Sequence, residues 1–228
     1  MSLEKMNKVE KVSKSKDHTA MEEQANVKTK STFREYAEAI GMALLLALFI
    51  RTFIVQAFKI PSGSMIPTLQ IGDHILVNKL AYGVRMPFLE RYLVEYTTPQ
   101  RGDVVVFIFP EDRSKDFIKR VIGVAGDTIE VRGKKVYVNG KQIEDPHAHF
   151  EGDDPQLAGI IGRDDFGPKT VPENHIFVMG DNRDRSYDSR FWGYVSLDEV
   201  RGKAILIYWS WDGADRWVRW ERLGSLIR

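Results

Sequence analysis

Two apolar runs set the character of the chain: Val104-Val-Val-Phe-Ile-Phe109 and Phe117-Ile-Lys-Arg-Val-Ile-Gly-Val124. Both are short and rich in β-branched and aromatic residues, and such runs are typical of strands. Similar runs occupy residues 75–77, 129–131, 136–138, 176–179 and 204–209. We therefore predict a mainly β domain.

Turn signals support this interpretation. Asn139-Gly140 stands between two of the runs, and a type I′ hairpin turn needs positive φ at both of its central residues, which this pair tolerates. Residues 144–172 are rich in Asp, Gly and Pro and predict a surface excursion. No helical pattern of comparable strength follows Phe58.

The first part of the chain has a different composition. Residues 1–35 are mostly polar and lack apolar periodicity, which predicts a disordered tail. The run 40–50 (IGMALLLALFI) follows, is interrupted at Arg51 and resumes up to Phe58. Residues 36–58 are long enough to cross a bilayer, which takes roughly 20 mostly apolar residues. Arg51 lies past the midpoint of this range, where a long side chain reaches the head groups. A soluble amphipathic helix is the alternative.

The flanking charges predict an orientation. Lys28, Lys30 and Arg34 precede the apolar segment, whereas Lys59 stands alone after it. The positive-inside bias then places the N-terminal tail in the cytoplasm and residues 59–228 outside.

The overall composition excludes several chemistries. The net charge is +1, so no basic surface for nucleic acid is indicated. There is no cysteine, which removes disulfides, thiolate metal sites and cysteine nucleophiles. His147 and His149 lack further metal-ligand spacing, so we predict no metal and no cofactor.

A serine nucleophile is still possible outside the usual triad. No G-x-S-x-G motif is present, but Pro61-Ser62-Gly63-Ser64-Met65-Ile66-Pro67 follows the apolar segment directly. Its prolines and glycine restrict the backbone around two hydroxyl groups. Taken alone, this segment favours a rigid turn that leaves the membrane.

Lys119 is the candidate base, because it interrupts a strand of large apolar residues. A lysine in such a run normally points to solvent from an edge strand. If it is buried instead, desolvation lowers its pKa from about 10.4 toward 7–8, where it can accept a serine proton.

A third segment, residues 180–193, is dense in charge and ends in the aromatic pair Phe191-Trp192. It is either a solvated loop with local ion pairs or a support for a catalytic amine. In the second case Asp188 and Arg190 pin the loop and Ser186 orients the amine.

Together these segments resemble the bacterial type I signal peptidase (leader peptidase) family. The matching stretches occur in family order: Ser62-Gly-Ser-Met-Ile-Pro-Thr-Leu69, Gly72-Asp-His-Ile-Leu-Val-Asn-Lys79, Lys119-Arg-Val-Ile-Gly-Val-Ala-Gly-Asp127 and Gly180-Asp-Asn-Arg-Asp-Arg-Ser-Tyr-Asp-Ser-Arg190. Four ordered motifs are far more specific than one.

The resemblance implies a fold and a role for each matching residue. It implies an antiparallel β-sheet catalytic domain behind one transmembrane helix. Ser64 is expected to be the nucleophile, Lys119 the general base, and Ser62 with the Ser64 N–H the oxyanion hole. The remaining expected roles are lysine orientation and support for Ser186, Asp188 and Arg190, and apolar substrate pockets for Phe58, Ile60, Met65, Leu69 and Ile118.

The implied reaction is removal of signal peptides from exported preproteins at Ala-x-Ala-like sites, through an acyl-enzyme. The implied partners are secretory preproteins and membrane lipid, with proximity to the secretion translocon, and the implied location is the bacterial cytoplasmic (inner) membrane. Two rivals remain: a Ser/Lys protease with another target, such as a self-cleaving repressor, and a non-catalytic membrane-tethered β module. The tryptophans at 209, 211, 217 and 220 indicate either bilayer contact or core packing.

Overall fold

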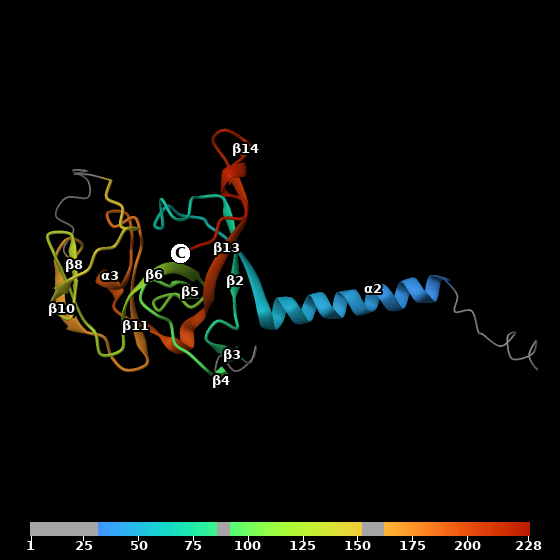
Figure 1. Ribbon diagram of the computed structural model, residues 1–228, viewed down its shortest axis with the longest axis horizontal. Helices are drawn as coiled ribbons and strands as arrows, with labels where there is room; N and C mark the ends of the chain where they lie inside the picture. Colours follow the sequence, from blue (N-terminus) through green and yellow to red (C-terminus); the bar gives the residue numbers. More distant parts are fainter. Residues whose placement is uncertain (1–31, 86–91, 152–161) are drawn as a thin grey trace, which may run out of the picture. The chain divides into compact units, whose positions relative to one another are not determined.

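The computed structural model describes residues 32–85, 92–151 and 162–228. The chain divides after Ala47 into two compact units. The first contains most of one long helix, and the second contains the β domain (Figure 1).

Helix α2 spans Thr32–Phe49 and continues as a π-helical turn, Ile50–Ile54. Together they are long and apolar enough to cross a membrane. Leu44, Leu45 and Leu46 are all exposed. Residues 39–50 are all apolar and, because consecutive residues point about 100° apart, they present apolar side chains on every side of the helix, unlike the amphipathic helix of the alternative interpretation.

The predicted boundaries of this region differ from the structure at both ends. The helix begins at Thr32, so residues 32–35 of the expected tail are helical, and residues 1–31 lie outside the described part. Strand β1, Val55–Lys59, takes the last residues of the expected anchor 36–58. Its Phe58 pairs with Ile75, which places it in the sheet of the β domain.

The main sheet runs in the order β1-β2-β13-β5-β6-β11-β12, with β14 added to β13. The remaining strands of this sheet are β2 Asp73–Asn78, β5 Val104–Ile108, β6 Asp116–Val124, β11 His175–Met179, β12 Val195–Ser196, β13 Val200–Asp212 and β14 Trp217–Val218. The pairings between these strands are antiparallel, as the resemblance implied. All seven predicted runs lie wholly or largely within strands, so the mainly β prediction is confirmed.

Two smaller sheets complete the domain, with order β10-β7-β8-β9 and β3-β4. Their strands are β3 Gly83–Arg85, β4 Tyr92–Glu95, β7 Thr128–Arg132, β8 Lys135–Val138, β9 Lys141–Gln142 and β10 Phe166–Thr170. Short helical turns occupy Ser189–Trp192, which is α3, Leu197–Glu199 and Trp220–Arg222.

One turn prediction is confirmed and one loop prediction is partly wrong. Asn139 and Gly140 both have positive φ (54° and 77°) and join β8 to β9. The expected excursion 144–172 contains β10, which pairs with β7, although residues 152–161 lie outside the described part. Asp, Gly and Pro in this segment concealed the strand, because these residues are depleted in strands generally.

The core is built where strands are covered on both faces. All five residues of β5 are buried, and β6 lies between β5 and β11 (Figure 1). Strand β6 is therefore an interior strand, and any polar side chain on it must find its partners inside the protein.

Candidate active site

The turn between β1 and β2 holds Ser64 at the edge of the core. The next side chain, Met65, is fully buried, and the Leu69 N–H donates to the Met65 carbonyl at 2.8 Å. Ser64 itself is 8% exposed. The apolar anchor at Met65 thus fixes the backbone while the adjacent hydroxyl stays within reach of a substrate.

Lys119 meets this hydroxyl from β6. Its Nζ lies 2.7 Å from Ser64 Oγ and 3.0 Å from the Ile118 carbonyl oxygen, to which it donates. The side chain is 4% exposed, so the usual assignment of a strand lysine to a solvent-facing edge is excluded here. Burial lowers the pKa of Lys119 from 10.5 to about 8, although the Asp188 and Asp181 carboxylates partly oppose the shift.

The loop after β11 packs against the turn that carries Ser64. The Asn182 N–H donates to the Ser64 carbonyl at 3.1 Å, and Asn182 Nδ2 donates to the Gly63 carbonyl at 3.3 Å. At Gly180, a Cβ would lie 2.4 Å from the Ser64 carbonyl oxygen and 2.3 Å from Ser186 Oγ. Only glycine permits this close approach of the two segments.

A buried ion pair stabilises the same loop. Arg190 Nε and a terminal guanidinium nitrogen each lie 2.9 Å from an oxygen of Asp188. Burial alone would raise the pKa of Asp188, but Arg190, Ser186 and the Gly180 N–H outweigh it and hold this pKa below its usual range. Asp188 is therefore a carboxylate near neutral pH.

Ser186 joins this support rather than contacting the amine directly. Its Oγ accepts from the Gly180 N–H at 3.2 Å and bonds to Asp188. Among the described residues, the hydrogen bonds of Lys119 go to Ser64 and Ile118.

A second buried pair lies beside the first. Arg120 donates through two nitrogens to Asp181 at 2.8 and 2.7 Å, and Thr68 Oγ1 donates to Asp181 at 2.6 Å. Asp181 thus ties the nucleophile turn to β6 and to its own loop. The Gly180-Asp-Asn motif carried this signal in the sequence, although the role of Asp181 was not predicted.

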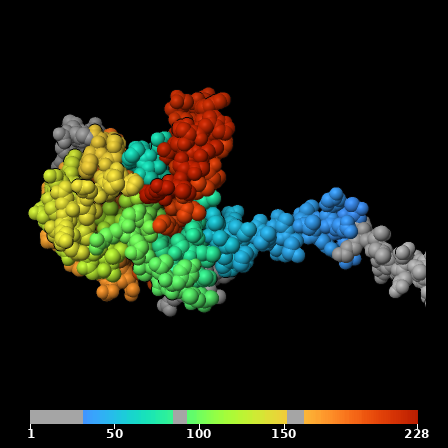
Figure 2. All heavy atoms as spheres, in the orientation of Figure 1, coloured from blue at the N-terminus to red at the C-terminus, as the bar shows by residue number. Residues whose placement is uncertain are grey.

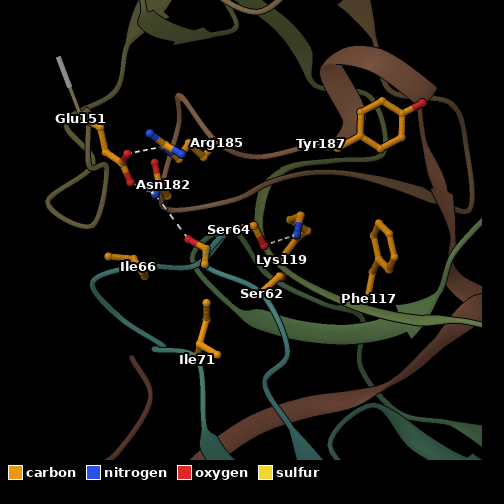
Figure 3. A pocket seen from close by; sticks show the side chains of 11 residues that line it. Ser62, Ser64, Ile66, Ile71, Phe117, Lys119, Glu151, Asn182, Arg185 and Tyr187 are labelled. Carbon is orange, nitrogen blue, oxygen red and sulfur yellow. Dashed lines mark hydrogen bonds and ion pairs between the residues drawn. The ribbon is translucent and has the colours of Figure 1, made fainter. Parts of the chain in front are cut away.

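The dyad lies in a cleft of about 540 Å³. Figure 3 shows Ser64 and Lys119 facing each other at its centre, with Phe117 and Tyr187 to one side and Asn182, Arg185 and Glu151 to the other. The remaining lining residues are Ser62, Gly63, Ile66 and Ile71. A buried amine in contact with a serine hydroxyl in an open cleft can support nucleophilic chemistry, because an adjacent base can accept the hydroxyl proton.

Residues 33–209 match the family model described as signal peptidase, peptidase S26. The chain belongs to this signal peptidase family. It is a serine-type peptidase, and its apolar helix α2 fits a membrane-anchored protein.

Individual relatives agree with the family match. Signal peptidase I of Pseudomonas aeruginosa is 38% identical over 209 residues, which cover 78% of this chain and 72% of the relative. The enzymes of Leptolyngbya laminosa and Bacillus licheniformis are 37% and 33% identical, covering 80% and 84% of this chain and 82% and 97% of their own lengths.

In this signal peptidase the five residues expected to form substrate pockets are not among the residues that line the described cleft. They share one apolar cluster, in which Ile60, Met65 and Leu69 are buried and Phe58 and Ile118 are partly buried. The apolar side chains that line the cleft are instead Ile66, Ile71, Phe117 and Tyr187. Sequence reasoning named the correct segments but missed these neighbours, because it could not tell which side of each segment faces the cleft.

The structure also shows the surroundings of His149 and of the C-terminal tryptophans. His149 takes part in backbone hydrogen bonds with the 181–183 loop, and no cluster of three or more metal-ligand side chains occurs within the described residues. The four C-terminal tryptophans are 37–66% exposed, which excludes core packing for them.

Proposed function

We propose that this chain is a signal peptidase I that removes signal peptides from exported preproteins with Ser64 as nucleophile and Lys119 as general base. The observation that carries the proposal is the 2.7 Å separation of Ser64 Oγ from a buried Lys119 Nζ. With a pKa of about 8, a useful fraction of the amine is neutral near physiological pH.

The chemistry follows from these positions. Neutral Lys119 accepts the Ser64 proton as Oγ attacks the scissile carbonyl carbon, and the resulting oxyanion accepts hydrogen bonds from the Ser64 N–H and the Ser62 hydroxyl. The Lys119 ammonium then protonates the departing amine, which leaves an acyl-enzyme. Lys119 next takes a proton from a water molecule that attacks the ester carbonyl carbon, and it returns this proton to Ser64 Oγ as the ester C–O bond breaks, which releases the acid and restores both side chains.

The neighbouring loop keeps the base in place. Asp188 and Arg190 hold residues 180–190 against the nucleophile turn, and Ser186 links this pair to Gly180. In this proposal Ser186 orients Lys119 within the Michaelis complex, where hydrogen bonds tighten relative to the free enzyme.

Substrate specificity is proposed to arise from the walls around the dyad. An extended chain with small side chains at alternate positions, as in an Ala-x-Ala site, fits a cleft backed by the cluster of Phe58, Ile60, Met65, Leu69 and Ile118. The extended substrate adds as a strand beside the residues flanking the dyad.

The proposal also includes the orientation of the protein in the membrane. The N-terminus is cytoplasmic and the β domain lies outside the bacterial inner membrane, near the secretion translocon. Figure 2 shows the C-terminal segment, in red, projecting from the body of the β domain. Its exposed tryptophans suit the lipid interface, where amphipathic rings settle.

The test is cleavage of a preprotein with an Ala-x-Ala site by purified protein in detergent. Wild type should cut at that site, and Ser64→Ala and Lys119→Ala should each lose activity by orders of magnitude while retaining their thermal unfolding transitions. A wild type that cuts other targets but not preproteins would favour the alternative Ser/Lys protease. A folded wild type that binds preprotein without cutting any target would favour the non-catalytic module.

A further inference from the structure

One end of the cleft differs chemically from the rest of its wall. Arg185 and Glu151 form an ion pair there, and Asn182 Nδ2 donates to the other carboxylate oxygen of Glu151 at 2.6 Å. Asn182 in turn contacts Gly63 and Ser64. A charged group is thus joined by direct hydrogen bonds to the nucleophile turn.

The charges of this group are unequally accessible. The Arg185 side chain is 54% exposed, whereas the Glu151 side chain is 28% exposed and has both of its oxygens in contact. The charged residues that line the described cleft are Lys119, Arg185 and Glu151. Arg185 therefore presents the most accessible charge at this end of the cleft.

The position of this group places it within reach of a peptide that runs along the cleft. Figure 3 shows Arg185 and Glu151 on the side of Ser64 opposite Phe117 and Tyr187. A peptide whose scissile carbonyl lies at Ser64 extends in both directions from it, so one flank of the peptide passes the apolar pair and the other passes Arg185.

We propose that Arg185, held by Glu151 and Asn182, is a specificity-determining residue that favours an acidic side chain on one flank of the scissile bond. The inference rests on the proposed peptidase function for its substrate. A substrate carboxylate shares the guanidinium with Glu151, because an exposed ion pair is weak and exchanges partners readily. Arg suits this role since its planar fork recognises carboxylates directionally.

The experiment scans charge along the substrate. A neutral Ala-x-Ala reference peptide receives Glu, Gln or Lys singly at each of several positions on both sides of the scissile bond, and kcat/KM is measured with the full chain in detergent. On one flank, Glu should exceed Gln by about fivefold or less, the range expected for one partly exposed charge pair, and Lys should fall below Gln. The preference should weaken as salt is added.

Variants assign the effect to the residue. Arg185→Gln should abolish the preference and Arg185→Glu should reverse it. Glu151→Gln should increase it, because the guanidinium loses its competing carboxylate, whereas a purely structural role for the pair predicts a decrease. Arg113→Gln is the matched control, since Arg113 pairs with Glu199 and does not line the cleft.

A binding readout separates this inference from the proposed function. Dissociation constants of the same peptides for the Ser64→Ala variant report charge preference without turnover. Cleavage of the neutral reference with equal rates for Glu, Gln and Lys at every position overturns the inference and leaves the function standing. A charge preference in binding that depends on Arg185, without cleavage by wild type, supports the inference and contradicts the function.

Discussion

Lys119 and Arg120 are consecutive residues of β6, and both side chains are buried, yet their surroundings differ. Arg120 forms a two-point ion pair with Asp181 and also donates to the Gly102 and Arg228 carbonyls. Lys119 lies on the other face of the strand, where it contacts a serine hydroxyl and one backbone carbonyl.

The charge of Arg120 is used in a structural ion pair, whereas the amine of Lys119 is available for proton transfer. The Arg120 guanidinium contacts a carboxylate directly, whereas the hydrogen bonds of the Lys119 amine go to neutral groups, so that burial outweighs the attraction of the more distant carboxylates. The pKa of Lys119 falls accordingly. The site therefore depends on keeping the nearby carboxylates engaged with Arg120 and Arg190.

The largest effect is expected from a substitution that keeps a positive charge at position 119 but prevents proton exchange there. Lys119→Arg should reduce kcat/KM by about 10³-fold or more, because a guanidinium stays protonated and cannot act as a base. Single-turnover cleavage of a preprotein measures this. Lys119→Met is the control for bulk, and substantial activity in the Arg variant would contradict the base assignment.

Breaking the Arg120–Asp181 ion pair should lower the stability of the fold. Asp181→Ala leaves Arg120 buried without its carboxylate, and we expect a loss of about 3–5 kcal/mol in the free energy of unfolding. Urea denaturation of the detergent-solubilised chain measures it. Glu199→Ala, which breaks the exposed pair with Arg113, should cost less than about 1 kcal/mol. Equal losses in the two variants would show that burial does not distinguish the pairs.

Replacing Lys119 should raise the free energy of unfolding, whereas replacing Asp181 should lower it. Because the folded-state pKa of Lys119, about 8, lies below the ordinary lysine value of 10.5, burial of the charged amine opposes folding below about pH 8, and wild-type stability rises relative to Lys119→Met between pH 8 and 10.5. Lys119→Met should therefore be more stable near neutral pH by up to about 3 kcal/mol, at 1.36 kcal/mol per unit. Urea titrations at a series of pH values test this, and a pH-independent difference would contradict it.

The smallest expected effect is the change in kcat/KM for each unit of pH. Below about pH 8, kcat/KM should rise tenfold per pH unit, because the neutral fraction of Lys119 rises tenfold, and then level off. Initial rates on a peptide with an uncharged flank measure the profile. A plateau already reached at pH 6 would mean that Lys119 is not the titrating base.

Much of the fold was predictable, because local patterns report it. The β-branched runs became strands, and Asn139-Gly140 became the β8–β9 turn. The start of β1 was not predictable, since Val55, Ala57 and Phe58 continue the apolar character of the helix before them and only pairing with β2 makes Val55–Lys59 a strand. Strand β10 was missed because its pairing with β7 overrides its weak local preference.

The site was predictable to the level of segments. The motif serines and Lys119 came together, whereas Glu151 and Arg185 were not recognised as neighbours of the nucleophile. Their proximity depends on how two loops fold over Ser64, and loop positions leave little trace in composition.

The sequence by itself determined the apolar helix, the β class of the domain and the residues capable of acid–base and nucleophilic chemistry, because these follow from side-chain types and their periodicity. Only the tertiary structure decided that Lys119 is a buried amine in contact with Ser64 rather than a surface charge. That decision depends on β6 lying between β5 and β11, which buries the amine against Ser64 and removes it from water. Strand order is set by long-range pairing, and desolvation exists only once that pairing has formed.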